Sequence, residues 1–233
     1  MKNKDLTKQK WQKGKRNTLT FYQRKSKWKF ERFNRKFPLY DYFAPMIDDK
    51  KEVLIADLGA GLISTTGNTW PTAKIKLYPS DILADKFNKM LEEKNKKWGK
   101  RFKWGYKPLF PVEQQDMENL TYKDNFFDIV HCVNGLDHCA NPIAAIKEMY
   151  RVCKVGGWIY LRHFPDNAII QSYHGFHQWN LTPNPKVGST DCIIWNRENR
   201  FLLSKVIPGF KTEVRQELDN EPNYMIISKL QKC

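Results

Sequence analysis

Two patterns of apolar positions alternate along the chain: short apolar runs and longer amphipathic stretches. Short apolar runs bounded by turn residues are typical of strands buried on both faces of a parallel sheet. Apolar positions three and four residues apart, with lysines opposite, are typical of surface helices. These patterns predict strands at 53–57, 75–78, 112–115, 127–133, 158–161, 210–214 and 224–227, helices at 82–97 and 142–152, and a short helix and loop at 38–50.

Alternation of strands and helices is the order that builds a doubly wound parallel sheet, so we predict an α/β fold. A further helix is expected from Ser64, with its length limited by Pro71. A turn is expected at Gly156 and Gly157. Residues 164–192 break the rhythm with three prolines and a cluster of histidines and aromatic residues. A segment of this length and composition predicts an insertion that covers the substrate.

Composition narrows the class of protein. Of the 233 residues, 41% are hydrophobic and 14% aromatic, which is enough for one large α/β domain. The sequence contains no run of eighteen apolar residues, so no membrane-spanning helix is expected. No apolar segment follows the basic N-terminus, which argues against a secretory signal. Five cysteines form no CxxC pair and no zinc-like spacing, so we expect reduced thiols in a cytoplasmic protein.

The net charge of +15 is concentrated at the N-terminus. Residues 1–37 contain fourteen Lys or Arg and two acids, so this arm has a net charge of about +12. We therefore divide the chain into a basic arm or helix, 1–37, and a domain, 38–233. Three interpretations of the arm remain open: a helix docked through Trp28, Phe33 and Phe37, a site for an anionic small substrate or polysaccharide, or a nucleic-acid contact.

The run from Val53 to Asp57 leads directly into two spaced glycines, Gly59 and Gly61. Glycines after a buried strand permit a tight turn and a close approach of the backbone to a ligand. Asp81 follows twenty residues after Gly61, where the next strand would present it to ribose hydroxyls. The pattern predicts a nucleoside-binding turn. An NAD site is disfavoured because Ser64 occupies the position of the third glycine in the dinucleotide fingerprint.

Further motifs give this turn a family context. Gln115-Asp116-Met117 is followed by Asn119 to Val130 and by Glu148 to Gly157. With these motifs in this order and spacing, the sequence from Val53 to Leu161 resembles the class I S-adenosylmethionine-dependent methyltransferases, in particular the small-molecule branch called type 11. The resemblance implies a Rossmann-like sheet of seven strands, mostly parallel with one antiparallel strand near an edge, and helices on both faces.

The resemblance also implies S-adenosylmethionine as cofactor and a role for each motif residue. Ile63 stands where the family often has a third glycine, with Gly67 nearby, which leaves the shape of the turn open. By the family pattern, Asp57, Gly59 and Gly61 line the methionine end, Asp81 holds the ribose hydroxyls, Asp116 holds the adenine amine, Met117 packs on the adenine edge, and Asn134 faces the sulfonium.

Methyl transfer requires an aligned acceptor and, for a protonated acceptor, a group that removes the proton. His138 directly follows the fourth predicted strand and His163 follows the fifth, at the edge where ligands bind in such sheets. Both are candidate catalytic bases, and Asp137 could orient a neighbouring imidazole. His138 could instead cap the next helix or orient the cofactor.

The segment from Tyr173 to Asn180 resembles a segment of type 11 enzymes encoded among surface-polysaccharide genes. Aromatic faces and imidazole donors suit a sugar ring, so His174, His177 and Trp179 are candidate substrate-binding residues. An ordinary aromatic packing cluster is the alternative. No metal site is expected, because no third ligand stands at a convincing spacing from His174 and His177.

These patterns together predict a cytoplasmic methyltransferase that converts S-adenosylmethionine to S-adenosylhomocysteine. The expected acceptor is a small polar molecule, anionic or sugar-like, such as a precursor of a surface glycan or capsule, and O-methylation is favoured. An RNA methyltransferase that uses the basic arm is the alternative, and a cofactor-binding module without activity is the third hypothesis. The sequence leaves the oligomeric state open.

Overall fold

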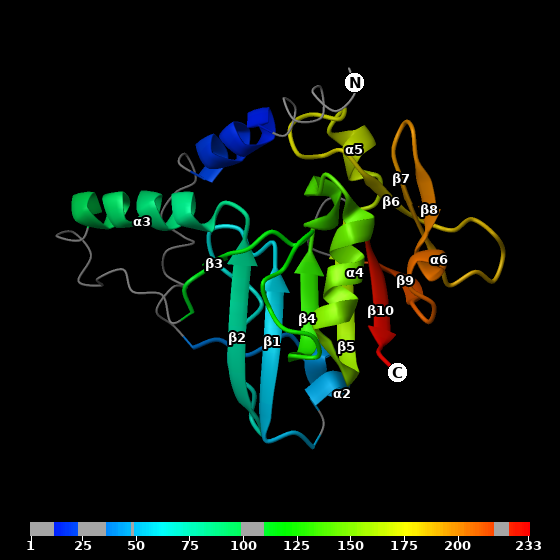
Figure 1. The fold of residues 1–233 in the computed structure, drawn as a ribbon, viewed down its shortest axis with the longest axis horizontal. Coiled ribbons are helices and arrows are strands. Elements are labelled where there is room, and N and C mark those ends of the chain that lie inside the picture. Colours follow the sequence, from blue (N-terminus) through cyan, green and yellow to red (C-terminus); the bar gives the residue numbers. More distant parts are fainter. Residues whose placement is uncertain (1–11, 23–35, 48, 99–109, 217–223) are drawn as a thin grey trace.

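The computed structural model describes residues 12–22, 36–47, 49–98, 110–216 and 224–233 (Figure 1). Its main element is a seven-stranded sheet with the strand order β3-β2-β1-β4-β5-β10-β9. The pairs within β3-β2-β1-β4-β5 are parallel, whereas β10 is antiparallel to both β5 and β9. The predicted fold is therefore confirmed. The strands are β1 (Glu52–Leu58), β2 (Lys74–Asp81), β3 (Glu113–Gln114), β4 (Phe127–Val133), β5 (Cys153–His163), β9 (Lys211–Gln216) and β10 (Tyr224–Gln231).

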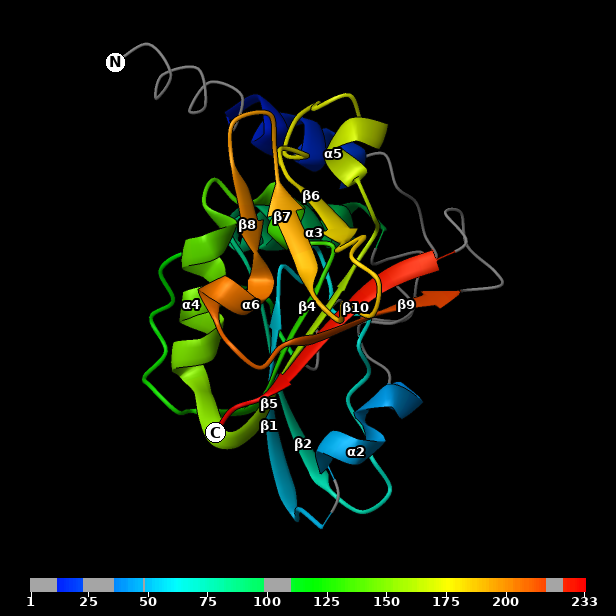
Figure 2. The same ribbon diagram turned by 90° about the vertical axis from the view of Figure 1, so that its right-hand side faces the viewer.

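Two layers of helix cover the sheet because successive side chains of a strand point to opposite faces. Val53 and Ile55 of β1 pack in a cluster with Phe43 and Ile47, whereas Ala56 and Leu58 pack in a second cluster with residues of α4. Figure 2 shows α2 and α4 on opposite faces of the sheet. The helices of this body are η2 (Asp41–Phe43), α2 (Ala44–Ile47), α3 (Ala84–Trp98), η3 (Leu136–His138) and α4 (Pro142–Val152).

The start of α4 follows from its first residues. The Asn141 side chain accepts a hydrogen bond from the Ala144 amide at 3.2 Å, and Pro142 occupies the first turn, where a missing amide hydrogen costs nothing. Buried residues then recur every three or four positions, including Ile146 and Met149. The predicted helix at 142–152 is confirmed at both ends.

Two local predictions are wrong. Residues 59–73 contain no helix, because the chain beyond the glycine turn packs against the segment near Pro38. Gly67 has a φ of +96°, and a Cβ there would lie 2.2 Å from the Pro38 carbonyl oxygen. The turn expected at Gly156 and Gly157 lies within β5, which begins at Cys153 and has an irregular register opposite β4.

A smaller antiparallel sheet lies beside the main one. Residues 164–192 contain α5 (Asn167–Ile170) and β6 (Asn180–Pro183), and β6 pairs with β7 (Cys192–Trp195), which pairs with β8 (Arg200–Leu202). A short helix, α6 (Leu203–Val206), follows. Within the described ranges, no helix has the length and apolar character needed to cross a membrane.

The basic arm contributes one described helix, residues 12–22. Figure 1 shows it above the ends toward which β2, β1 and β4 point. The predicted docking residues Trp28 and Phe33 lie outside the described residues.

Candidate active site

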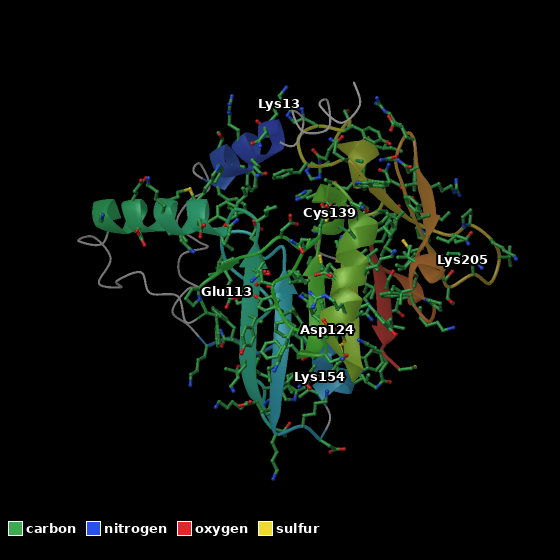
Figure 3. All side chains as sticks on the ribbon, viewed as in Figure 1. Lys13, Glu113, Asp124, Cys139, Lys154 and Lys205 are labelled. Atoms are coloured by element: carbon green, nitrogen blue, oxygen red, sulfur yellow. The ribbon has the colours of Figure 1, made fainter. Side chains whose placement is uncertain are left out.

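A pocket lies at the carboxyl ends of the parallel strands β1, β2 and β4, the edge at which sheets of this type bind ligands. The helix of residues 12–22 and the segment before β6 also contribute to its wall. Cys139, labelled in Figure 3, lies in this wall below that helix. The lining residues are Thr18, Gly59, Ser80, Asp81, Ile82, Leu83, Gln115, Asp116, Met117, Glu118, Gly135, His138, Cys139 and Phe176.

The glycine turn after β1 forms part of this wall. Gly59 and Gly61 have φ values of +73° and +66°, in the left-handed region that favours glycine. The amides of Gly59 and Ala60 both donate to the Ser80 carbonyl oxygen at 2.9 Å, which joins the turn to the end of β2. A Cβ at Gly59 would lie 3.1 Å from the Met117 methyl carbon. The missing side chain therefore keeps the backbone close to the pocket.

Asp81 joins the same turn to the end of β2. Its Oδ2 accepts from the Gly61 amide at 3.0 Å, and its Oδ1 accepts from the Leu83 amide at 2.8 Å. Burial raises the pKa of Asp81, and these two hydrogen bonds oppose the rise. Each carboxylate oxygen has about two acceptor positions, so each retains one for a ligand hydroxyl.

Asp116 and Met117 complete the part of the pocket that follows β3. Asp116 Oδ1 accepts from the Glu118 amide at 2.9 Å, which closes a local turn and leaves its other oxygen for the pocket. The Met117 methyl carbon would lie 3.3 Å from a Cβ at Gly135. Gly59 and Gly135, which follow neighbouring strands, thus leave a narrow space beside the Met117 thioether.

Three other predicted cofactor residues lie outside the pocket lining. Asp57 Oδ1 lies 2.9 Å from His131 Nδ1, in a pair of side chains that are only 6% and 1% exposed. Gly61 lies under Tyr22, whose hydroxyl would be 2.6 Å from a Cβ at that glycine. Asn134 Oδ1 accepts from the Phe164 amide at 2.9 Å and so joins the ends of β4 and β5.

A polar cluster of Asp137, His138 and His177 lies next to the pocket. Asp137 Oδ2 is 2.7 Å from His177 Nδ1 and 3.5 Å from His138 Nε2. His138 lines the pocket, and its ring lies 5.6 Å from that of Phe176. His138 does not cap α4, because Asn141 does. Asp137 and His177 are separated by forty positions, and no spacing in the sequence indicated that they meet.

Burial sets the charge states in this cluster. Burial lowers the pKa of His138, although the Asp137 carboxylate opposes this shift. Burial alone would raise the pKa of Asp137, but the nearby imidazoles of His138 and His177 outweigh it, so the pKa lies below its ordinary value.

The remaining predicted residues occupy different environments. His163 is 1% exposed, does not line the pocket, and has no hydrogen-bond partner for either ring nitrogen among the described residues. Burial lowers its pKa to about 4, and its assignment as a base stays a prediction. Trp179 is buried in the core beside Phe201, as the packing alternative expected. His174 is exposed and accepts from Asn17 Nδ2 at 3.0 Å, so it contacts helix 12–22.

Known proteins match the same part of the chain. Residues 57–161 match the family model described as "Methyltransferase domain". The ubiquinone/menaquinone biosynthesis C-methyltransferase UbiE of Neisseria meningitidis is 34% identical over 76 residues, which cover 32% of this chain and 31% of that protein. The enzyme of the same name from Coxiella burnetii is 33% identical over 142 residues, which cover 60% of this chain and 44% of that protein. The chain thus spans less than half the length of either relative.

A solved structure of a SAM-dependent methyltransferase from Methanosarcina mazei is 21% identical and covers 84% of this chain and 100% of that one, with a TM-score of 0.45. The family match begins at Asp57, in the strand that enters the glycine turn, and ends in β5, so it includes the strands that bear the pocket. Residues 57–161 of this chain are therefore similar to a methyltransferase domain.

Proposed function

We propose that this chain transfers a methyl group from S-adenosylmethionine to a hydroxyl of a small polar acceptor. The supporting observation is that one continuous pocket is lined both by the carboxylates Asp81 and Asp116 and by His138. Carboxylates suit the ribose and adenine donors of the cofactor, and an imidazole suits the acceptor hydroxyl. We assign the methionine end to the space left by Gly59.

The chemistry requires alignment and one proton transfer. A lone pair of the acceptor oxygen attacks the methyl carbon, the carbon–sulfur bond breaks, and its electrons remain on sulfur to give S-adenosylhomocysteine. The acceptor hydroxyl loses its proton in the process. We assign the activation of this hydroxyl to His138, because it is the histidine that lines the pocket.

We further propose a sugar or a phosphorylated sugar precursor of a surface glycan as the acceptor. Phe176 lines the pocket beside His138 with 6% of its surface exposed, and Asn167 and His177 provide polar groups nearby. A sugar ring has one apolar face and several hydroxyls, which matches this combination. A quinone-like aromatic acceptor is the second candidate, because the relatives named above are C-methyltransferases of quinone biosynthesis.

An acceptor screen tests these assignments. The untagged chain would be incubated with S-adenosylmethionine and separate pools of sugar nucleotides, sugar phosphates, quinone precursors and RNA, and mass spectrometry would locate the added methyl group. We expect a methyl group on a sugar hydroxyl. A methyl group on an aromatic carbon would support the quinone-like acceptor. A methyl group on RNA would support an RNA methyltransferase that uses the basic arm. Absence of S-adenosylhomocysteine in every pool would refute catalysis.

Replacement of Asp81 tests the cofactor half of the pocket. Asp81→Ala removes the acceptors assigned to the ribose, so we expect S-adenosylmethionine to bind at least about tenfold more weakly in calorimetry. Asp85→Ala, an exposed acid on α3, is the matched control and should bind normally. Equal affinities for the two variants would contradict the assignment.

Replacement of His138 tests the acceptor half. For His138→Gln we expect turnover to fall on the order of 100-fold, because the acceptor hydroxyl is no longer activated. Cofactor affinity, measured by calorimetry on the same preparation, should stay within about twofold, since Asp81 and Asp116 are retained. Full turnover in this variant would remove His138 from the mechanism.

A further inference from the structure

Four polar side-chain atoms meet at one point beside the pocket. His177 Nδ1 lies 2.7 Å from Asp137 Oδ2 and 3.2 Å from His138 Nε2. The Asn167 amide nitrogen lies 2.8 Å from Asp137 Oδ2 and 3.0 Å from His177 Nδ1. Three nitrogen atoms thus surround one carboxylate oxygen.

Protons satisfy only part of this arrangement. If His177 Nδ1 and the Asn167 amide both donate to Asp137 Oδ2, the two acceptor positions of that oxygen are filled. Asp137 Oδ1 then still has no hydrogen-bond partner among the described residues. If His177 Nδ1 is unprotonated, its lone pair faces the ionised carboxylate at 2.7 Å, and a cation between the two atoms would be attractive to both.

The spacing of the atoms agrees with that of metal ligands. Ligand atoms about 2.1 Å from a shared ion lie about 3.0 to 3.4 Å from each other in octahedral or tetrahedral geometry. Of the three distances among Asp137, His138 and His177, 3.2 Å lies within this range, and 2.7 and 3.5 Å lie just below and just above it. Two imidazoles and one carboxylate suit zinc and its first-row neighbours better than calcium or magnesium.

Burial gives a second, independent observation. The Asp137 side chain is 3% exposed, and its Oδ1 has no hydrogen-bond partner among the described residues. A buried carboxylate without full compensation of its charge is costly, so this position favours a nearby cation. The side chains of His138 and His177 are 35% and 29% exposed, which leaves one side of the cluster open. Three protein ligands with an open position are typical of catalytic metal sites.

From this geometry we propose that Asp137, His138 and His177 bind one divalent first-row transition-metal cation, with Asn167 beside it. Within the described ranges, they are the group of histidine and acidic side chains whose ligand atoms all lie within 4.8 Å of one another. The catalytic consequence rests on the proposed function: the cation takes the acceptor hydroxyl as a further ligand and lowers its pKa, and the proton leaves to water. His138 then acts as a metal ligand.

Metal binding is tested without cofactor or acceptor. The untagged full chain, stripped with a chelator and dialysed, would be titrated with Zn²⁺ in a calorimeter and with Co²⁺ by visible absorption. We expect one cation per chain and a cobalt spectrum of nitrogen and oxygen ligands. His177→Gln and Asp137→Asn should each weaken Zn²⁺ binding on the order of 100-fold. His174→Gln, an exposed histidine three positions from His177, is the matched control and should bind Zn²⁺ as the parent does.

The outcomes separate this proposal from the proposed function. Absence of stoichiometric Zn²⁺ binding, or equal binding by His177→Gln and His174→Gln, would overturn the metal site even if methyl transfer occurs. One cation per chain lost with His177 would support it even if the acceptor screen fails. Near-ultraviolet circular dichroism would show whether Asp137→Asn folds. If it does not fold, the comparison of Zn²⁺ binding between His177→Gln and His174→Gln decides the result.

Discussion

Two aspartate–histidine pairs in this protein have nearly the same contact but opposite surroundings. Asp57 and His131 lie on adjacent parallel strands, with their side-chain atoms 2.9 Å apart. Asp137 and His177 lie on a short turn and on the segment before β6, 2.7 Å apart. In the first pair both side chains are almost fully buried, whereas in the second the imidazole is 29% exposed.

The first pair is closed on every side. His131 Nε2 is bonded to the Tyr42 hydroxyl at 2.9 Å, and Thr66 lies beside Nδ1 at 3.4 Å. Tyr42 stacks on Tyr160 with ring centroids 4.5 Å apart. The second pair retains an unpartnered carboxylate oxygen among the described residues and an open imidazole. A satisfied and sealed pair stabilises the fold, whereas an unsatisfied and open pair has capacity left for a ligand.

The largest expected effect comes from removing each carboxylate in turn. Asp57→Ala leaves His131 buried without its carboxylate partner, and we expect a loss of about 3 kcal/mol in the free energy of unfolding. Asp137→Ala should cost less than about 1 kcal/mol, because its histidine partners can turn to water and an unpartnered buried oxygen is removed. Urea unfolding followed by circular dichroism measures both.

Equal losses for the two variants would remove the distinction between the sealed and the open pair. If Asp57→Ala kept its stability but lost affinity for S-adenosylmethionine, Asp57 would belong to the cofactor site, as the family pattern implies.

His163 provides an intermediate case, because it is buried like His131 but unpartnered among the described residues. Burial lowers its pKa to about 4, an effect that Asp137 opposes and that His138, His131 and Arg162 reinforce. The unfolded chain, with an ordinary histidine pKa near 6.5, therefore binds this proton more readily than the folded protein. Stability is fully present above about pH 6.5 and decreases as the pH falls toward 4.

Between pH 7 and pH 5 we expect this histidine to account for about 2 kcal/mol of lost stability. His163→Phe removes the titrating group, so the difference between its urea midpoints at the two pH values should be smaller than that of the parent protein. Because other groups titrate in both proteins, the comparison isolates His163. Identical pH dependence would show that His163 has an ordinary pKa in the folded state.

The part of the site that was predictable from the sequence lies at strand ends. Gly59 directly follows β1, Asp81 ends β2 and Asp116 comes two positions after the short strand β3, and parallel strands bring their carboxyl ends to one edge. Order along the chain therefore indicated proximity in space. The same reasoning explains why the strand and helix positions of the α/β body were predictable, since periodicity depends on near neighbours alone.

The rest depends on contacts between distant segments. Asp57 lies opposite His131 because of the strand register, which the apolar run does not specify. His177 reaches Asp137 through the loop before β6, and Gly67 turns the chain toward Pro38 instead of starting a helix. The positive charge of the arm also did not predict that helix 12–22 lies over the pocket, where Thr18 forms part of the pocket wall.

The smallest expected effect tests how far the sealed pair depends on its outer hydrogen bond. Tyr42→Phe keeps the ring stacked on Tyr160 but removes the hydroxyl at His131 Nε2, so we expect a loss of about 1 kcal/mol in the free energy of unfolding. Tyr40→Phe is the matched control, because Tyr40 stacks on Tyr42 but is 44% exposed, and its hydroxyl can exchange a partner for water. Urea unfolding of both variants should separate them. If the Tyr42→Phe protein were as stable as the control, the hydrogen bond between Tyr42 and His131 would add no stability. Tyr42 would then stabilise the pair only through the packing of its ring.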